Sequence, residues 1–121
     1  MKTSELTGPT LDWAVAKCEG HKVQINYVGC IHRLYFDYPP NYPYAPIHYS
    51  TDWSQGGPII EREKICVNAY ITSPDAGWNA CIYIGGVRRF HLNGPTPLIA
   101  AMRCFIASKL GDEIEIPEEL I

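Results

Sequence analysis

Two segments of the chain carry a glycine–proline sequence that often opens a helix, and both could bind an anion. Gly56-Gly57-Pro58 precedes a predicted short helix over residues 58–63, and Gly94-Pro95-Thr96-Pro97 precedes a predicted helix over 97–110. The first turn of a helix leaves backbone N–H groups unpaired and carries a partial positive charge, and a preceding glycine lets a ligand approach closely. Thr96 could cap its own helix or offer its hydroxyl to that ligand. The alternative is that both segments are ordinary helix caps.

One aromatic and two charged side chains near these segments could hold the rest of a nucleotide. Trp53 follows Asp52 in a polar stretch, where the indole could stack on a base and the carboxylate could accept hydrogen bonds. Arg103 lies in the longer predicted helix and could pair with a phosphate through two N–H groups. Alternatively, Trp53 fills the core from a loop, and Arg103 forms an ion pair with Glu61, Glu63 or the acidic C-terminal tail. We predict one ligand pocket formed by Asp52, Trp53, Gly56, Gly57, Thr96 and Arg103.

The residue patterns that mark catalytic or metal centres are missing from the sequence. The four histidines are isolated, and no H-x-E, H-E-x-x-H, C-x-x-C, G-x-S-x-G or phosphate-binding Walker pattern occurs. Glu61 and Glu63 could serve as acid and base only if they were buried together, and a solvated helix is the expected setting. We therefore expect no metal and no cofactor. The sequence favours binding over catalysis and leaves an enzyme open.

Length and charge limit the classes of protein to be considered. The chain has 121 residues with 46% hydrophobic and 19% charged residues, which fits a single globular domain over residues 1–121. Its net charge of −3 argues against nonspecific binding to duplex nucleic acid, which needs a basic face, and the only local basic cluster is Arg88-Arg89 with His91. No stretch has the pattern of a signal peptide or a membrane span. We therefore expect a cytoplasmic protein whose five scattered cysteines are reduced, buried thiols.

Alternation of apolar and polar residues predicts five strands, because period two is typical of half-buried strands. These segments are residues 23–27, 30–36, 65–72, 78–84 and 87–92. Helices are predicted at 9–19 and 97–110, each followed by a glycine that can end it. The order indicates an α+β fold, in which an antiparallel sheet of four to five strands packs against an N-terminal and a longer C-terminal helix. The side chains expected to face the longer helix are Ile65, Val67, Ala69, Ile71, Ala80, Ile82 and Ile84.

Two further segments fall outside this pattern. Residues 37–50 are rich in proline and tyrosine, a composition that excludes helix and central strand but suits packing against another surface. We therefore expect a structural flap or a contact between copies, and a homo-oligomer, most simply a dimer. Residues 112–121 form an acidic tail, which we expect to be loosely attached.

Three segments, taken together, resemble the phage NinX-like family. They are Ser4-Glu5-Leu6-Thr7-Gly8 with residues 11–17, the stretch 49–63 around Asp52-Trp53-Ser54-Gln55-Gly56-Gly57-Pro58, and the stretch 94–103 with Gly111-Asp112-Glu113 beyond it. This family contains small proteins of tailed phages and prophages, and it is classified as a domain of unknown function. The resemblance implies a phage accessory protein that acts in the cytoplasm of the bacterial host. It implies no agreed activity and no catalytic residues.

Three functions are compatible with these observations. The first is a non-enzymatic protein that binds and sequesters a small anionic, nucleotide-derived ligand, such as a nucleotide signal of a bacterial immune system. The second is a protein-binding adaptor, or an inhibitor of a host enzyme, that acts through the tyrosine-rich loop. The third is a small hydrolase of nucleotides, which the missing acid–base and metal patterns disfavour.

Overall fold

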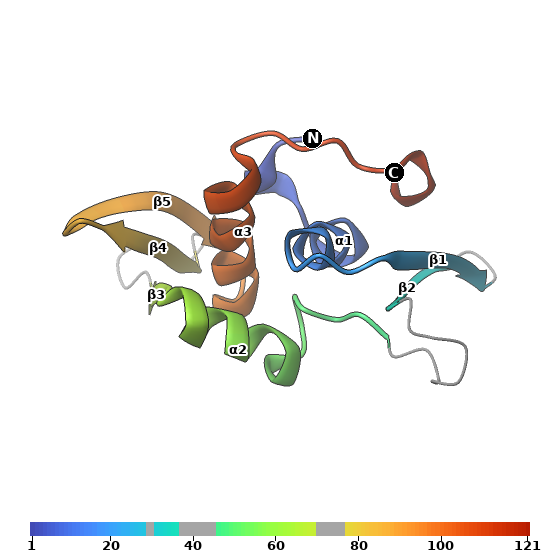
Figure 1. Ribbon diagram of the computed structural model, residues 1–121, viewed down its shortest axis with the longest axis horizontal. Coiled ribbons are helices and arrows are strands. Elements are labelled where there is room, and N and C mark those ends of the chain that lie inside the picture. Colours follow the sequence, from blue (N-terminus) through green and yellow to red (C-terminus); the bar gives the residue numbers. More distant parts are fainter. Residues whose placement is uncertain (29–30, 37–45, 70–76) are drawn as a thin grey trace.

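The longest helix, α3 (Pro97–Leu110), lies at the centre of the molecule (Figure 1). The structure is a computed structural model and describes residues 1–28, 31–36, 46–69 and 77–121. As predicted, Thr96 caps α3 by accepting a hydrogen bond from the Ile99 N–H at 3.1 Å, and Gly111 follows its last residue with φ +88°. All residues from Ala100 to Ala107 are buried. A helix that is buried all round needs other elements on each of its sides.

Helix α1 (Gly8–Cys18) covers one side of α3, after a short 3-10 turn, η1 (Thr3–Glu5). Its bounds differ by one residue from the predicted helix over 9–19. Leu11, Val15 and the alanines beside them are fully buried against the core. The α1 helix therefore supplies the apolar face that the sequence predicted.

A three-stranded antiparallel sheet packs on another side of α3. Its strands are β3 (Cys66–Ala69), β4 (Trp78–Ile84) and β5 (Val87–Gly94), in the order β3-β4-β5. Ala80 is fully buried, and Val67 and Ile82 are half-buried against the core, as expected. Together with the helices, this sheet confirms an α+β fold.

Two residues expected to face α3 are exposed instead, so that part of the prediction is wrong. Ile84 has an exposed fraction of 53%, because it lies at the turn of the β4–β5 hairpin, which extends beyond α3 (Figure 1). Ala69, the last residue of β3, is also exposed. Ile65 is buried but precedes β3, and Ile71 lies outside the described residues. Alternation identifies which side chains share a face, but it does not say how far the supporting helix reaches.

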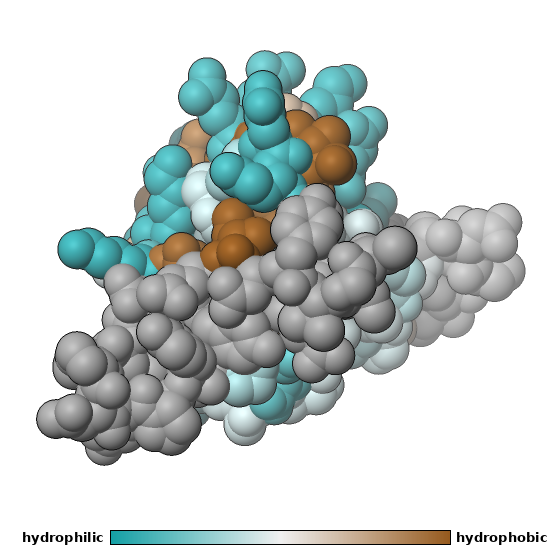
Figure 2. All heavy atoms as spheres, turned by 90° about the vertical axis from the view of Figure 1, so that its right-hand side faces the viewer, coloured by the Kyte–Doolittle hydropathy of each residue, from teal (hydrophilic) through white to brown (hydrophobic). Residues whose placement is uncertain are grey.

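The prediction of one sheet of four to five strands is also wrong. Within the described ranges, β1 (Val23–Val28) and β2 (Ile31–Phe36) form a separate two-stranded antiparallel sheet that contacts α1. This hairpin and the three-stranded sheet lie on opposite sides of α3 (Figure 1). The strands are divided between two sheets because the apolar surface of α3 is covered on both of its sides. On the side that carries the hairpin, patches of apolar surface lie between polar side chains (Figure 2).

Helix α2 (Trp53–Glu63) begins five residues before the predicted start at Pro58, so the predicted helix over 58–63 is too short. Asp52 caps α2 by accepting a hydrogen bond from the Ser54 N–H at 2.8 Å. Pro58 therefore lies inside the helix rather than at its start. The side chain of a residue before proline normally clashes with the ring in helical geometry, and Gly57 has no such side chain.

The two ends of the chain pair with each other. The Thr3 N–H donates to the Asp112 carbonyl at 2.8 Å, and the Ile114 N–H donates to the Met1 carbonyl at 3.0 Å. Ile114 and Leu120 are buried, with exposed fractions of 7% and 8%. The expectation of a loosely attached tail over 112–121 is therefore wrong. Of the predicted loop over 37–50, residues 37–45 lie outside the described part, and Ile47, Tyr49 and Ser50 are buried.

Candidate functional site

A pocket of about 200 Å³ lies between the first turns of α2 and α3. The residues that line it are Ser50, Thr51, Trp53, Thr96, Pro97, Leu98 and Ile99. Two of the six predicted site residues, Trp53 and Thr96, therefore meet at one pocket although they are far apart in the sequence. This is the arrangement that a shared site between the two helix starts requires.

Gly56 explains why these helix starts lie close together. A Cβ atom at this position would come within 2.6 Å of Leu98 Cδ1 and 2.7 Å of the Tyr49 carbonyl oxygen. Only a residue without a side chain lets α2 approach α3 this closely. A Cβ atom at Gly57 would contact only Trp53 Cε3, at 4.0 Å. The two glycines therefore differ: Gly56 is required for helix packing, whereas Gly57 is half-buried and has room beside it.

Trp53 has an exposed fraction of 54%, so the alternative in which it fills the core is wrong. Its indole is available for stacking at the edge of the pocket. Asp52, the preceding residue, accepts hydrogen bonds from the Ser54 N–H and from Ser54 Oγ at 2.8 and 2.6 Å. These bonds lower the pKa of the Asp52 carboxyl. The Asp52 side chain thus serves as the cap of α2 and is not part of the pocket lining.

Buried polar groups lie beneath the pocket. Ser50 lines it with an exposed fraction of 2%, and its Oγ atom is enclosed and forms no hydrogen bond of ordinary geometry. The Ser50 N–H donates to Oδ1 of Asp12, a buried residue of α1, at 2.7 Å. Burial raises the pKa of the Asp12 carboxyl, and its contacts with Ser50 offset only part of the increase. The Asp12 carboxylate is therefore the polar group that lies against the enclosed Ser50 side chain.

Sequence reasoning missed Asp12 and Ser50. Asp12 lies off the face of the first helix that carries Leu11 and Val15, yet it precedes the buried Ala16 by one helical turn and so shares its face. That spacing is the one signal that could have identified it. Ser50 carried no such signal, because its burial depends on the packing of α1 and α2 around the 46–52 stretch.

Arg103 does not line this pocket. Its guanidinium is buried, with Nε donating to the Leu6 carbonyl and Nη1 donating to the Asn93 carbonyl, both at 2.8 Å. Burial lowers the pKa of this group. Among the described residues, the alternative ion pair of Arg103 with Glu61, Glu63 or the acidic tail is not formed either, and Glu63 instead lies 3.5 Å from Arg62 and 3.3 Å from Lys109. Arg103 instead joins the N-terminal segment and the end of β5 to α3.

The pocket is mainly apolar and is not cationic. None of the described residues that line it carries a charged side chain. In the first turn of α3, Pro97 has no N–H and the Ile99 and Ala100 N–H groups donate to Thr96. The Leu98 N–H is left without an acceptor among the described residues, and it carries the partial positive charge of a helix start. The geometry thus offers one backbone donor, the hydroxyl-bearing side chains of Ser50, Thr51 and Thr96, and an aromatic face.

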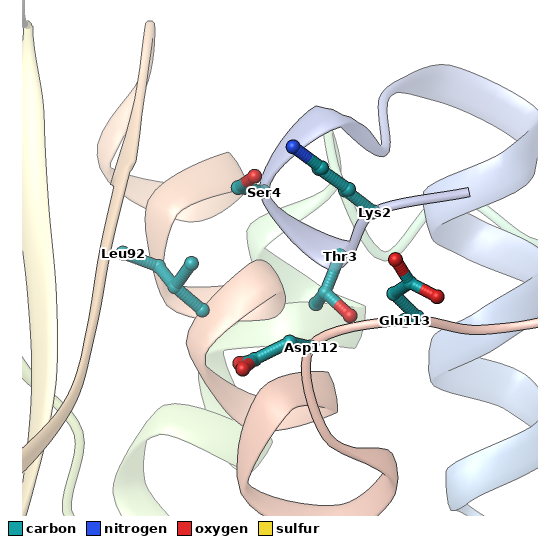
Figure 3. A pocket seen from close by; sticks show the side chains of 6 residues that line it. All are labelled: Lys2, Thr3, Ser4, Leu92, Asp112 and Glu113. Carbon is teal, nitrogen blue, oxygen red and sulfur yellow. The ribbon is translucent and has the colours of Figure 1, made fainter.

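A second pocket, of about 160 Å³, lies where the two ends of the chain pair (Figure 3). Lys2 lies at its rim together with Asp112 and Glu113, so one positive and two negative side chains give the rim a net negative charge. Thr3 already donates its hydroxyl hydrogen to the Gly111 carbonyl at 2.7 Å. The polar groups of this pocket therefore stabilise the paired ends of the chain and leave little for a ligand.

Comparison with known families identifies a family of phage proteins. The family model described as Bacteriophage P22, NinX matches residues 2–109, and the chain belongs to this family. The match confirms the resemblance inferred from the three sequence segments. No curated protein matches the chain. No helix in residues 1–28, 31–36, 46–69 and 77–121 is long and apolar enough to cross a membrane.

Proposed function

We propose that this phage protein binds and sequesters a small, anionic, nucleotide-derived ligand in the cytoplasm of the bacterial host, without converting it. The observation that carries the proposal is the exposed Trp53 indole at a pocket between two helix starts. A base stacked on that indole would direct its polar edge toward Thr96 and the Leu98 N–H. Stacking and a backbone donor are a common combination for nucleotide recognition.

The size of the pocket sets how much of the ligand it can enclose. Complete sites for small molecules usually have volumes of about 300–1,000 Å³, whereas this one has about 200 Å³. It suits one base or one phosphate group, and the rest of the ligand would lie across Trp53 and the adjacent surface. Because no cationic side chain lines the pocket, the anionic group would depend on the first turn of α3 for its stabilisation.

The lining also favours binding over hydrolysis. Its described side chains are hydroxyl, aromatic or apolar, and none of them is an acid or a base that titrates near neutral pH. Asp12 is the nearest buried carboxyl, and it lies below the pocket in contact with Ser50. A hydrolase would need a general base within reach of the ligand.

The test is ligand capture with mononucleotides and cyclic oligonucleotides as probes. The purified protein is incubated with each probe, separated from free probe, and heated to release what it has bound, which is identified by chromatography. Intact probe supports sequestration, and an altered product favours the hydrolase. The absence of uptake across the panel contradicts the proposal and favours the adaptor that acts through residues 37–50.

Substitution of Trp53 tests the site itself. Loss of one base stack of about 1–3 kcal/mol predicts that Trp53→Ala weakens binding roughly 5- to 150-fold. Tyr83→Ala is the matched control, because Tyr83 is an equally exposed aromatic residue, with an exposed fraction of 55%, on the distant β4–β5 hairpin. A bulky side chain at Gly57 should also weaken binding while the domain stays folded. Equal affinities of the Trp53 and Tyr83 variants would refute the assignment of the site.

A further inference from the structure

Two cysteines face each other across neighbouring strands of the three-stranded sheet. Cys66 of β3 is the direct partner of Cys81 of β4 in the antiparallel register, and both are free thiols. Side chains of directly opposed residues lie on the same face of a sheet. Cys66 is half-buried, whereas Cys81 has an exposed fraction of 1%. One thiol of the pair is thus accessible from solvent and the other lies beneath the surface beside it.

The backbone geometry suits a covalent bond between them. Directly opposed residues of an antiparallel pair have Cα atoms about 4.5–5.5 Å apart. This separation falls within the range of about 4.4–6.8 Å found for disulfides. Two strands that are already paired would therefore accept the bond with little movement of the backbone.

Polar groups around the pair modify its reactivity. Asn68 Nδ2 donates to Cys66 Sγ at 3.3 Å, and Arg88 is placed on the same face by a 3.4 Å hydrogen bond to Asn79 Oδ1. Burial and the neighbouring Cys66 raise the pKa of the Cys81 thiol, whereas Arg88 lowers it. Arg88 is thus positioned to stabilise a thiolate at Cys81 when that thiol reacts.

Two other described cysteines lack this environment. Burial raises the pKa of Cys18 to about 11 and that of Cys104 to about 12. Cys104 also donates its thiol hydrogen to the Phe90 carbonyl at 2.8 Å. Thiolate is the reactive form of cysteine, so both residues should be inert near neutral pH.

We propose that Cys66 and Cys81 are a redox modification site, which forms a reversible cross-strand disulfide by exchange with a low-molecular-weight disulfide. The Cys66 thiolate attacks one sulfur of the small disulfide, whose S–S bond breaks and releases one small thiolate. Cys81 then loses its proton to solvent and attacks Cys66 Sγ, which releases the second small thiolate. Two electrons pass from the protein to the small disulfide, and both of its halves leave as thiols.

The bond has a measurable structural consequence, because it would join β3 to β4 and close the chain between residues 66 and 81. A crosslink that closes a loop of about 15 residues restricts the unfolded chain and raises the Tm of a domain this size by about 5–15 °C. In a reducing cytosol the pair stays as two thiols, and it would respond when the ratio of small disulfide to thiol rises.

The test uses oxidised glutathione as the small disulfide. The full-length reduced protein is equilibrated with increasing ratios of oxidised to reduced glutathione, and free thiols are then blocked with N-ethylmaleimide. Trypsin cuts after Lys64 and Arg88, which leaves both cysteines in one peptide of residues 65–88. Oxidation should lower the mass of this peptide by two hydrogens, with no label attached. A further cut after Tyr70 should leave two pieces that separate only on reduction.

Variants separate this proposal from nonspecific oxidation. Cys66→Ser, a substitution at the more accessible position, should abolish both the internal disulfide and the increase in Tm. Cys18→Ser is the matched control and should leave both unchanged. The proposal is overturned if both cysteines of the 65–88 peptide carry label at every ratio. It is also overturned if Cys66 retains glutathione while Cys81 stays free, or if Cys81 is linked to Cys104.

Discussion

Adjacent glycines in α2 should respond differently to the same substitution. Gly56→Ala places a Cβ atom 2.6 Å from Leu98 Cδ1 and 2.7 Å from the Tyr49 carbonyl oxygen. The Leu98 side chain can rotate away, but the Tyr49 carbonyl belongs to the backbone, so α2 itself must shift. Apart from its chain neighbours, the Cβ atom of Gly57→Ala meets only the Trp53 ring among the described residues, at 4.0 Å, which is an ordinary van der Waals contact. Neither glycine has a positive φ, but a Cβ atom at position 57 is also crowded by the ring of Pro58, the next residue of the helix.

The difference between the two variants can be estimated because they share one contribution. Alanine is favoured over glycine inside a helix by about 0.8–1 kcal/mol, and both variants gain this amount. Only Gly56→Ala also introduces overpacking, which destabilises a well-packed core by about 1–3 kcal/mol. At position 57 the crowding against the Pro58 ring offsets this gain, so Gly57→Ala should change the stability of the protein by less than about 1 kcal/mol. Gly56→Ala should be less stable than Gly57→Ala by about 1–2 kcal/mol.

Equilibrium unfolding in urea measures this difference directly. The midpoint should stay close to that of the original protein for Gly57→Ala and should be lower for Gly56→Ala, with an unchanged slope in both, because the surface exposed on unfolding is the same. Equal midpoints, or a higher midpoint for Gly56→Ala, would show that α2 does not rest on α3 through Gly56. The adjoining pocket between the helix starts would then lose its structural basis.

Four other outcomes are expected. Asp12→Asn should keep the hydrogen bond from the Ser50 N–H. Burial raises the pKa of Asp12 above 3.8, so the folded state binds the carboxyl proton more tightly than the unfolded state does. The original protein should therefore lose stability relative to Asp12→Asn as the pH rises through that raised pKa. Asp12→Ala leaves the Ser50 N–H unpaired and should destabilise the domain by about 1–3 kcal/mol in urea unfolding. Arg103→Met removes the hydrogen bonds to the Leu6 and Asn93 carbonyls and should lower stability by about 2–4 kcal/mol without changing the salt dependence of ligand binding. Light scattering at high micromolar concentration should give a mass above the 13.6 kDa of the monomer, and the monomer mass itself would exclude the expected dimer.

Local sequence signals predicted a helix well where a single capping residue determines where the helix begins or ends. The Thr96-Pro97 start and the Gly111 end define α3 without any tertiary information. The start of α2 was misplaced because Gly57-Pro58 was taken as a helix opening. The better signal was Asp52 followed three residues later by Gln55, a spacing typical of a helix start.

Long-range packing accounts for what could not be predicted. Alternation assigned strand residues to the faces of a sheet. Whether the strands form one sheet or two depends instead on how α3 is covered from both sides. Arg103 was expected to meet a ligand because it lies off the apolar stripe of its helix. Its true partners, the Leu6 and Asn93 carbonyls, belong to other segments that no local pattern links to it. The meeting of Trp53 with Thr96 was predicted as a hypothesis, and it depends on the contact between Gly56 and Leu98.

The central position of α3 has a consequence for the order of events during synthesis. The elements from α1 to β5 leave the ribosome before α3 does, yet their apolar faces are buried chiefly against it. Until residues 97–110 emerge, two separate hydrophobic surfaces have no partner, one on α1 and one on the three-stranded sheet. Nascent chains with such surfaces are prone to aggregate and are typical clients of chaperones. Folding of this domain is therefore expected to be completed only after α3 has emerged and can insert between the parts already made.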